Sequence, residues 1–208
     1  MSRSQRIRHH YQPRIDDLRA NYDVVDWASA EAQQIRFAVL ADNVPLDGRT
    51  LLDVGCGLGD LLTYLKGREI SADYCGVDLL GEMIESAQSR NPDGRFVCGD
   101  IFHAERNGEA LGANELFDVV FCSGMLNLDL GNNHDFLPNA LKRMMELASR
   151  HMVVNLLHTR TEKKYPHCTY YDPDSVLKIL KPITADVRLI DDYLPNDFTI
   201  ICNAAVGQ

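Results

Sequence analysis

Short apolar runs that alternate with helix-like segments are the feature of this sequence that most restricts its fold. Each run is dense in apolar residues rather than alternating with polar ones, which is typical of strands covered on both faces of a parallel sheet. The runs lie at residues 50–55, 73–79, 95–100, 117–124 and 151–157. Strands separated by helical segments in this way predict βαβ units and a mostly parallel sheet.

The last two apolar runs predict a different connection. Residues 186–194 and 197–206 are separated only by Pro195 and Asn196. So short a link forces an antiparallel hairpin. The whole pattern therefore predicts an α/β fold, a doubly wound and mostly parallel seven-stranded sheet with an antiparallel last strand.

Helical periodicity and end signals place helices around these strands. Ser29 is a candidate N-cap for a helix that would turn Ala32, Ile35 and Val39 inward. The other expected helices cover residues 59–67, 81–90, 134–148 and 172–180. The last of these begins with Asp172 and Pro173, an N-cap followed by a first-turn proline.

Residues 1–28 are expected to form an N-terminal arm and possible lid, ahead of a single domain that covers residues 29–208. The first 14 residues contain four arginines and no acidic residue: Arg3, Arg6, Arg8 and Arg14. Such a segment is either a frayed, solvated tail or an arm that closes over an anionic ligand. The sequence leaves both interpretations open.

Composition narrows the class of partner. The net charge of -9 repels phosphate backbones and disfavours nucleic acid. No apolar run is long enough to cross a bilayer, and the basic N-terminus is not followed by the apolar stretch of a secretory signal, so we expect a cytoplasmic location without membrane contact. Six cysteines lie scattered without a C-x-x-C pair, so we expect free thiols and no metal. The oligomeric state stays open.

The most specific local signal is LLDVGCGLGD, residues 51–60, in which an expected strand runs directly into a glycine turn and a helix. Gly55 and Gly57 allow backbone conformations closed to other residues, and they let a ligand approach without a Cβ in its way. A dinucleotide fingerprint would need glycine where Asp60 stands. A ligand without a pyrophosphate tolerates a carboxylate there, so the turn favours such a ligand.

Acidic residues follow the next two expected strands. Asp78 ends the second strand, about 20 residues beyond the glycines, where a carboxylate can accept both ribose hydroxyls of an adenosyl group. Asp100 and Ile101 follow the third strand and could meet the adenine edge. The glycine turn together with two acidic strand ends is a much stronger signal than the turn alone.

These motifs resemble those of the class I S-adenosylmethionine-dependent methyltransferases. The resemblance covers nearly all of the chain after about residue 27 and rests on LLDVGCGLGD, GVDLLGEMIESAQ, VCGDI and FDVVFCSGMLN. The expected antiparallel last strand also fits this family. The resemblance implies a Rossmann-like methyltransferase fold and S-adenosylmethionine as the cofactor.

The resemblance also implies roles for individual residues, grouped by the part of the cofactor that they would contact. Asp53, Gly55, Cys56 and Gly57 would line the methionine and ribose moieties, Asp78 would hold the ribose, Leu79 and Met83 would pack on adenine, Asp100 and Ile101 would flank it, and Ser123 would lie under the sulfonium. Leu79 and Met83 could instead be ordinary core residues.

The segment before the first strand has the composition of a lid. Tyr22 and Trp27 precede a helix that carries Arg36, and such a helix can close over the cofactor and exclude water. Tyr22 or Arg36 would then reach the methionine carboxylate. Alternatively, Trp27 and Phe37 only dock the helix on the sheet.

Methyl transfer from a sulfonium is an in-line displacement, so the main requirement is placement of donor and acceptor. A general base is needed only for an acceptor that is protonated. Acceptor-side candidates follow the fourth and fifth strands: Asn127, His158 and Tyr171 for catalysis, with Asn155, His167 and Tyr170 nearby. His158 suits a base, although a lone loop histidine is commonly structural. The two tyrosines could stack on a flat acceptor or pack against the next helix.

The identity of the acceptor is the least determined part of the prediction. The stretch SGMLN lacks the Asn/Asp-Pro-Pro-aromatic motif of methyltransferases that act on DNA bases or protein amides. We therefore expect a small-molecule acceptor, methylated on O, N, S or C. A protein methyltransferase and a non-catalytic adenosyl-binding subunit are the alternatives. An aminopropyl transferase would need an acidic pair where Asp129 stands alone, and a dehydrogenase would have to bind NADH.

Overall fold

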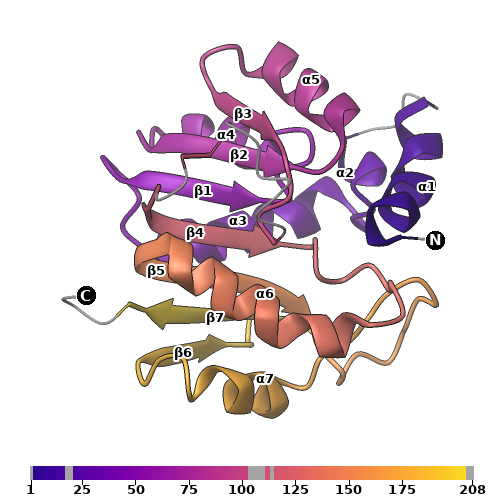
Figure 1. Ribbon diagram of the computed structural model, residues 1–208, viewed down its shortest axis with the longest axis vertical. Coiled ribbons are helices and arrows are strands. Elements are labelled where there is room, and N and C mark those ends of the chain that lie inside the picture. The colour runs from indigo at the N-terminus through magenta and orange to yellow at the C-terminus, as the bar shows by residue number, and fades with distance from the viewer. Residues whose placement is uncertain (1, 17–20, 103–110, 113–114, 205–208) are drawn as a thin grey trace.

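The computed structural model describes residues 2–16, 21–102, 111–112 and 115–204, and its centre is a seven-stranded sheet with helices on both faces (Figure 1). The strands are β1 (Thr50–Val54), β2 (Asp73–Asp78), β3 (Arg95–Cys98), β4 (Phe117–Ser123), β5 (Ala148–Leu157), β6 (Val187–Ile190) and β7 (Asp197–Asn203). The helices are α1 (Arg3–Asp16), α2 (Asn21–Val24), α3 (Ala30–Asn43), α4 (Asp60–Gly67), α5 (Gly81–Arg90), α6 (Asn133–Leu147) and α7 (Pro173–Leu180). None of the described helices is long and apolar enough to cross a membrane.

The strand order confirms the predicted fold. The order is β3-β2-β1-β4-β5-β7-β6, in which β1 to β5 pair in parallel and β7 runs antiparallel between β5 and β6. The chain builds outward from β1 to β3 and then crosses back to place β4 on the other side of β1. Ligands of doubly wound sheets bind at such a reversal, beyond the carboxyl ends of the strands.

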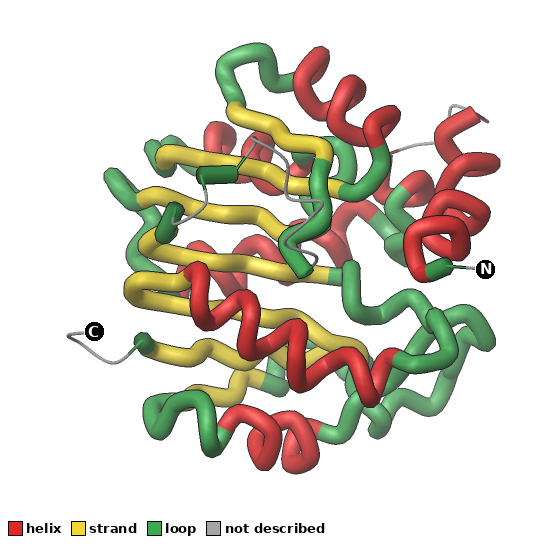
Figure 2. Tube along the Cα trace, in the orientation of Figure 1, coloured by secondary structure: helices red, strands yellow, loops and turns green. Residues whose placement is uncertain are grey.

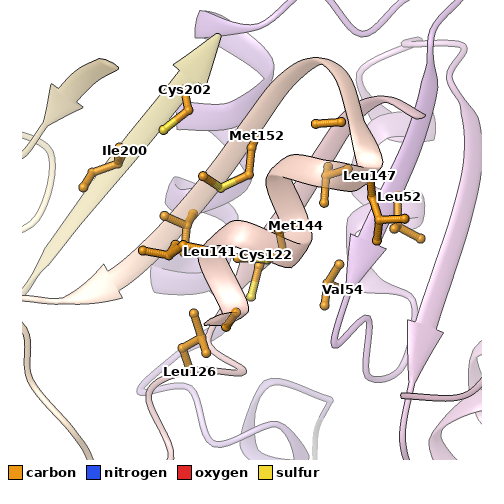
Figure 3. Packing of buried hydrophobic residues seen from close by; sticks show 14 of the residues in the cluster. Leu52, Val54, Cys122, Leu126, Leu141, Met144, Leu147, Met152, Ile200 and Cys202 are labelled. Carbon is orange, nitrogen blue, oxygen red and sulfur yellow. The ribbon is translucent and has the colours of Figure 1, made fainter. Parts of the chain in front are cut away.

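One face of the sheet packs against α6 and α7. Leu141 and Met144 of α6 lie against apolar side chains of four strands, among them Val54, Cys122 and Met152 (Figure 3). These residues are all almost fully buried. The predicted helical spacing of 134–148 is therefore confirmed, except that Ala148 begins β5 instead of ending the helix.

The other face packs against α3 and α4, which lie behind the sheet in Figure 1. Ser29 caps α3 as predicted, because its hydroxyl accepts a hydrogen bond from the Ala32 backbone at 3.1 Å. Of the three α3 residues predicted to face inward, only Val39 is buried, and the buried face of the helix is displaced by about one position from the predicted one. Phe37, Leu40 and Val39 are buried, whereas Ala32 and Ile35 are only partly covered.

The final hairpin is longer than the predicted two-residue link. Six residues, 191–196, separate β6 from β7. The reason lies in Arg160, whose guanidinium donates hydrogen bonds to the backbone carbonyls of Asp191, Leu194 and Pro195. Those carbonyls are therefore occupied by a side chain, and β6 ends at Ile190.

The N-terminal arm is a helix that packs on the carboxyl edge of the sheet, so a frayed tail is the wrong description of it. In Figure 2, α1 and α2 lie beside the carboxyl ends of the upper strands. Ile7, Tyr11 and Ile15 of α1 pack on a small apolar cluster that includes Leu58 and Met83. Three of the four arginines contact the domain, because Arg3 lies over the Phe136 ring, Arg6 donates to the Leu130 carbonyl and Arg8 pairs with Glu82. The fourth, Arg14, pairs with Asp26 inside the arm itself.

A buried ion pair joins α3 to β7. The Arg36 guanidinium donates from Nε and Nη2 to the two carboxylate oxygens of Asp197, and the two side chains are 3% and 0% exposed. Arg36 also lies over the Trp27 ring, with 4.2 Å between its Cζ and the ring centre. The Arg36–Asp197 pair thus positions α3, and Arg36 also contacts the Trp27 ring, which lies just before that helix.

Asp197→Ala is expected to lower the free energy of unfolding by about 3 to 5 kcal/mol, because it leaves the buried Arg36 charge uncompensated. Asp191→Ala is the matched control. It removes an ion pair with Arg160 in which both side chains are about 40% exposed, and it should cost no more than about 1 kcal/mol. Chemical denaturation of both variants measures the difference. Equal losses would contradict the structural role of the Arg36–Asp197 pair.

Candidate active site

A cavity opens at the carboxyl edge of β1, β2 and β4, where the strand order reverses. Its volume is about 1130 Å³, with open solvent at the mouth included. We call it the cofactor cavity, because ten of the twelve residues predicted to bind the cofactor line it: Asp53, Gly55, Cys56, Gly57, Asp78, Leu79, Met83, Asp100, Ile101 and Ser123. The tips of β1, β2 and β4 and the segment after β3 thus converge as the sequence motifs predicted.

The glycine turn has the geometry for which glycine is required. Gly55 has a φ of +76° and Gly57 a φ of +53°, both in the left-handed region. A Cβ on Gly55 would lie 2.7 Å from the Cβ of Met125 in the loop after β4. The backbone N–H groups of Gly55 and Cys56 donate to the Val77 carbonyl at 2.8 and 3.1 Å, which ties the turn to β2.

Asp78 connects this turn to the start of α5. Its Oδ2 accepts a hydrogen bond from the Gly57 N–H, and its Oδ1 accepts one from the Leu80 N–H, each at 3.0 Å. Burial raises the pKa of Asp78, while these two N–H groups stabilise its charged form. Each carboxylate oxygen can accept a further hydrogen bond. The carboxylate is therefore able to accept two ribose hydroxyls, and the site fits an adenosyl group.

Asp53 is a second carboxyl group on the cavity wall. It is 5% exposed on β1, and its Oδ2 accepts the Tyr74 hydroxyl at 2.7 Å. Burial raises the pKa of Asp53 to about 7, against the lowering effect of that hydrogen bond. Near neutral pH this group can therefore exchange a proton when a cation such as the cofactor's ammonium binds beside it.

Asp60 explains why the turn does not suit a pyrophosphate. It begins α4, and its carboxylate accepts hydrogen bonds from Arg90 at 2.7 Å and from Gln33 at 3.3 Å. A carboxylate at the helix N-terminus occupies the position where a phosphate would bind. The structure thus gives a physical basis for the mismatch with a dinucleotide fingerprint.

Apolar side chains form the part of the cavity assigned to adenine. Leu79 and Ile101 line it from the loops after β2 and β3, and Phe102 follows next in the chain. Asp100 accepts the Phe102 N–H at 3.0 Å, which shapes this loop. Met83 lines the cavity and also belongs to the core cluster beneath α1, so the two interpretations of this residue are compatible.

The opposite end of the cavity lies at the tip of β4. The Ser123 hydroxyl donates to Asn155 Oδ1 at 3.1 Å. Gly124 has a φ of +88°, and a Cβ there would lie 2.8 Å from the Trp27 ring. Trp27 therefore packs directly on the backbone beside the position predicted for the sulfonium.

Two predicted cofactor residues lie elsewhere. Tyr22 is outside the lining of the cofactor cavity, and the Tyr22 carbonyl accepts the Trp27 N–H at 2.7 Å. Arg36 is engaged by Asp197, so its guanidinium is not turned towards the methionine end. Trp27 and Phe37 do reach the cavity. The expectation that Tyr22 or Arg36 meets the methionine carboxylate is therefore not supported by this arrangement.

The sequence analysis allowed the N-terminal arm to close over a ligand, but it named none of the α1 residues that line the cavity. Arg3, Ser4, Ile7 and Tyr11 line the cofactor cavity from the N-terminal side. The sequence does contain a pattern that predicts a packed helix here, because Ile7, Tyr11 and Ile15 recur every four residues and form an apolar stripe. The four arginines of the same segment are consistent with a solvated tail as well, so charge alone does not identify this stripe.

His158 and Tyr171, two of the three catalytic candidates, belong to the packed interior. His158 is 9% exposed, its Nδ1 accepts the Arg160 N–H at 3.1 Å, and its ring packs on Phe198. Burial lowers the pKa of His158. The Tyr171 hydroxyl donates to the Leu126 carbonyl at 2.7 Å, and burial raises its pKa to about 12. Neither residue lines the cofactor cavity or its neighbour, so the structure does not bring these two candidates together with the predicted cofactor residues.

Asn127, the third candidate, lines a second cavity of about 1280 Å³, again with open solvent included. We call it the acceptor cavity. Five residues line both cavities, which are therefore adjacent and share this part of their walls: Tyr11, Val25, Trp27, Gly124 and Leu128. His167 and Tyr170 line the acceptor cavity as well. The donor side and the acceptor side therefore meet at the tip of β4.

Comparison with known proteins assigns the family. Residues 51–153 match the model of a methyltransferase domain. A protein of Mycobacterium tuberculosis named for methyltransferase activity is 30% identical over 166 residues, which cover 76% of this chain and 95% of that protein. The chain belongs to the class I S-adenosylmethionine-dependent methyltransferases, and S-adenosylmethionine is its cofactor.

Two further relatives are named for specific acceptors. A malonyl-[acyl-carrier protein] O-methyltransferase of Acetivibrio thermocellus is 32% identical over 66% of this chain. A trans-aconitate 2-methyltransferase of Afipia carboxidovorans is 29% identical over 49% of this chain. The alignments span 48% and 41% of those two proteins. In each case the similarity therefore covers about half of the relative or less.

Solved structures show the same fold at low sequence identity. Magnesium protoporphyrin IX methyltransferase of Synechocystis, solved with bound S-adenosylhomocysteine, has a TM-score of 0.67 and 14% identity, and the match covers 97% of this chain and 99% of that one. A [4+2]-cyclase matches with a TM-score of 0.66 and 14% identity, over 88% of this chain and 85% of its own. The fold is thus shared by proteins that are named for different reactions.

Gly55→Ala is expected to weaken S-adenosylhomocysteine binding by at least about tenfold, because the new Cβ would overlap Met125 and displace the loop after β4. Gly48→Ala is the matched control, since Gly48 has a φ of +67° and nothing lies within 4 Å of an added Cβ. Both variants should lose about 1 to 2 kcal/mol of stability from the left-handed backbone. Calorimetric titration measures binding, and equal affinities in the two variants would contradict the role of the turn.

Cofactor binding is expected to release a proton from Asp53. With its pKa at about 7, Asp53 is largely protonated at pH 6 and ionised at pH 8. The cofactor's ammonium favours the ionised form, so affinity should rise by up to about tenfold across this range. Calorimetry in two buffers of different ionisation enthalpy counts the protons. The count should fall in Asp53→Asn, and an unchanged count would exclude Asp53 as the source.

Proposed function

We propose that this methyltransferase acts on a small-molecule acceptor that enters through the acceptor cavity. The observation that carries the proposal is the contact between the two cavities at Gly124, the residue that follows Ser123 at the tip of β4. An acceptor in the second cavity would approach the methyl group from the side of this shared wall. The placement of the two ligands then supplies most of the catalysis.

Residues of both cavities have defined tasks in this proposal. When bound, S-adenosylmethionine supplies the methyl group on a positively charged sulfur. Asp78 would hold the ribose, and the backbone at Gly55 and Gly57 would allow the nucleoside to lie close to the turn. Trp27 and α1 would exclude water from the transfer. Ser123, with its hydroxyl held by Asn155, would contribute to the surface under the sulfonium.

One of the two relatives is named for a free small molecule and the other for an acyl group that a protein carries. The Acetivibrio and Afipia proteins are named for malonyl-[acyl-carrier protein] and trans-aconitate. The aromatic and apolar lining of the acceptor cavity in this chain is suited to a small organic acceptor, since such pockets usually combine apolar walls with a few placed polar groups.

A second candidate function is adenosyl binding without methyl transfer. It is favoured by the likeness to the [4+2]-cyclase, in which the same fold is associated with a different reaction. The two candidates differ in one measurable product. Only a methyltransferase converts S-adenosylmethionine to S-adenosylhomocysteine in the presence of an acceptor.

Asp78→Ala should weaken S-adenosylhomocysteine binding by at least about 1.5 kcal/mol, because two ribose hydroxyls lose a charged partner. Asp73→Ala, at the exposed opposite end of the same strand, should bind normally. Calorimetry measures both affinities.

Turnover is measured by chromatography of S-adenosylhomocysteine with a panel of small-molecule acceptors. Acceptor-dependent product, lost in Asp78→Ala but retained in Asp73→Ala at limiting cofactor, is the expected result. Tight binding without product across the panel would support the second candidate, and equal affinity of the two variants would remove Asp78 from the site.

A further inference from the structure

The acceptor cavity contains one polar group whose hydrogen-bonding capacity the protein leaves unused. Asn127 is 6% exposed, and among the residues that the structure describes its Nδ2 is buried without a hydrogen-bond partner. Buried polar groups in folded proteins are nearly always satisfied, so an exception in a cavity indicates a missing ligand atom. Because an amide nitrogen only donates, that atom must be an acceptor.

The orientation of the Asn127 amide is fixed by its other contacts. Its Oδ1 accepts the Leu157 N–H at 3.1 Å, so exchanging the oxygen and nitrogen would break this bond. Its backbone is held as well, since the Asn127 N–H donates to the Gly124 carbonyl at 2.9 Å and its carbonyl accepts the Thr169 N–H at 2.8 Å. The donor is therefore preorganised, one turn beyond the glycine that separates the two cavities.

The charges around the acceptor cavity favour an anionic ligand. Apart from three tyrosines and Cys168, its charged or titratable lining residues are Asp26, Arg36, Lys163 and His167. Asp26 is engaged by His10, Arg14 and His167 at 3.0 to 3.2 Å, and Arg36 is engaged by Asp197. Lys163 lies at the exposed rim, with its Nζ 5.2 Å from the centre of the Tyr165 ring. The Lys163 ammonium thus gives the rim of this cavity a positive charge, although the net charge of the whole chain is -9.

The rest of the lining suits an apolar or flat body. Tyr11, Trp27, Tyr165 and Tyr170 contribute rings, and Val25, Leu128 and Leu157 contribute aliphatic surface. Such walls bury the body of a ligand, while the few polar groups determine its orientation.

The placement of the candidate bases restricts the chemistry. His158 and Tyr171 are packed in the interior, and His167 contacts the Asp26 carboxylate through its Nε2 at 3.1 Å. An acceptor that is already deprotonated at neutral pH needs no base. A carboxylate meets this condition, because carboxylic acids ionise near pH 4.

We propose that the acceptor cavity binds a small carboxylic acid with an apolar body, that Asn127 Nδ2 and Lys163 hold its carboxylate, and that a carboxylate oxygen receives the methyl group. This inference rests on the proposed function. A lone pair of the carboxylate oxygen forms the new C–O bond, the C–S bond breaks, and its electron pair stays on sulfur. The products are a methyl ester and a neutral thioether, and no proton moves.

Matched probes test the binding step without any turnover. Protein saturated with S-adenosylhomocysteine is titrated calorimetrically with 4-phenylbutyrate and 4-phenylbutyramide, and with cinnamate and cinnamamide, which differ only in the carboxylate. We expect each carboxylate to bind at least about tenfold more tightly than its amide. Equal or tighter binding of the amides, or no binding of either carboxylate at millimolar concentration, would overturn the proposal.

Variants then identify the residues responsible. Asn127→Asp keeps an oxygen for the Leu157 N–H but replaces the donor with a negative charge, so carboxylate binding should fall by at least about 30-fold. Lys163→Ala should weaken it by about 3- to 5-fold, whereas Lys164→Ala should leave it unchanged. Lys164 is also exposed and does not line the cavity, and its Nζ lies 5.6 Å from the centre of the Tyr170 ring. Equal effects of the two lysine variants, or none from Asn127→Asp, would contradict the assignment.

The proposed function and the carboxylate inference can be tested separately, because different results would contradict each of them. S-adenosylhomocysteine affinity should stay within about twofold of the unmodified protein in all three variants, because none of them lines the cofactor cavity. If the unmodified protein did not bind S-adenosylhomocysteine, the proposed function itself would be contradicted. If the protein bound S-adenosylhomocysteine normally but methylated only amines, thiols or alcohols, the carboxylate inference alone would be contradicted.

Discussion

The carboxylate of Asp78 joins three segments that are neighbours only because of the order of the strands. One oxygen accepts the N–H of Gly57 in the turn after β1, and the other accepts the N–H of Leu80 where α5 begins. This arrangement requires β1 and β2 to pair in parallel, with Val54 opposite Val77, so that both strands end at the same edge. Two backbone donors compensate the burial of the charge and leave acceptor capacity for a ligand.

The remaining features of the site depend on that edge. The loop after β4 places Met125 against Gly55 and Gly124 against the Trp27 ring, so the cavity wall is built by contacts that only glycine permits. Trp27 in turn lies over Arg36, whose position is determined by Asp197 on β7. A buried ion pair at one side of the sheet therefore stabilises the partition between the donor and the acceptor cavities.

Features with a local physical cause could be predicted from the sequence. The doubly covered strands, the glycine turn and the acidic strand ends each follow from a requirement that a few adjacent residues satisfy, and Asp78 and Gly55 lie where the motifs placed them. Features that depend on contacts between residues far apart in the sequence could not be predicted in this way. The burial of His158 against Phe198, the pairing of Arg36 with Asp197 and the shortening of β6 by Arg160 all involve residues more than 30 positions apart.

The central claim is that Asp78 and the glycine turn together bind an adenosyl group at the carboxyl edge of the sheet. A crystal structure of the complex with S-adenosylhomocysteine tests it most directly. The account predicts both ribose hydroxyls within hydrogen-bond distance of the Asp78 carboxylate, and the sulfur beside Ser123 and Gly124, facing the acceptor cavity. A nucleoside bound elsewhere, or bound at this edge with its ribose turned away from Asp78, would contradict the account.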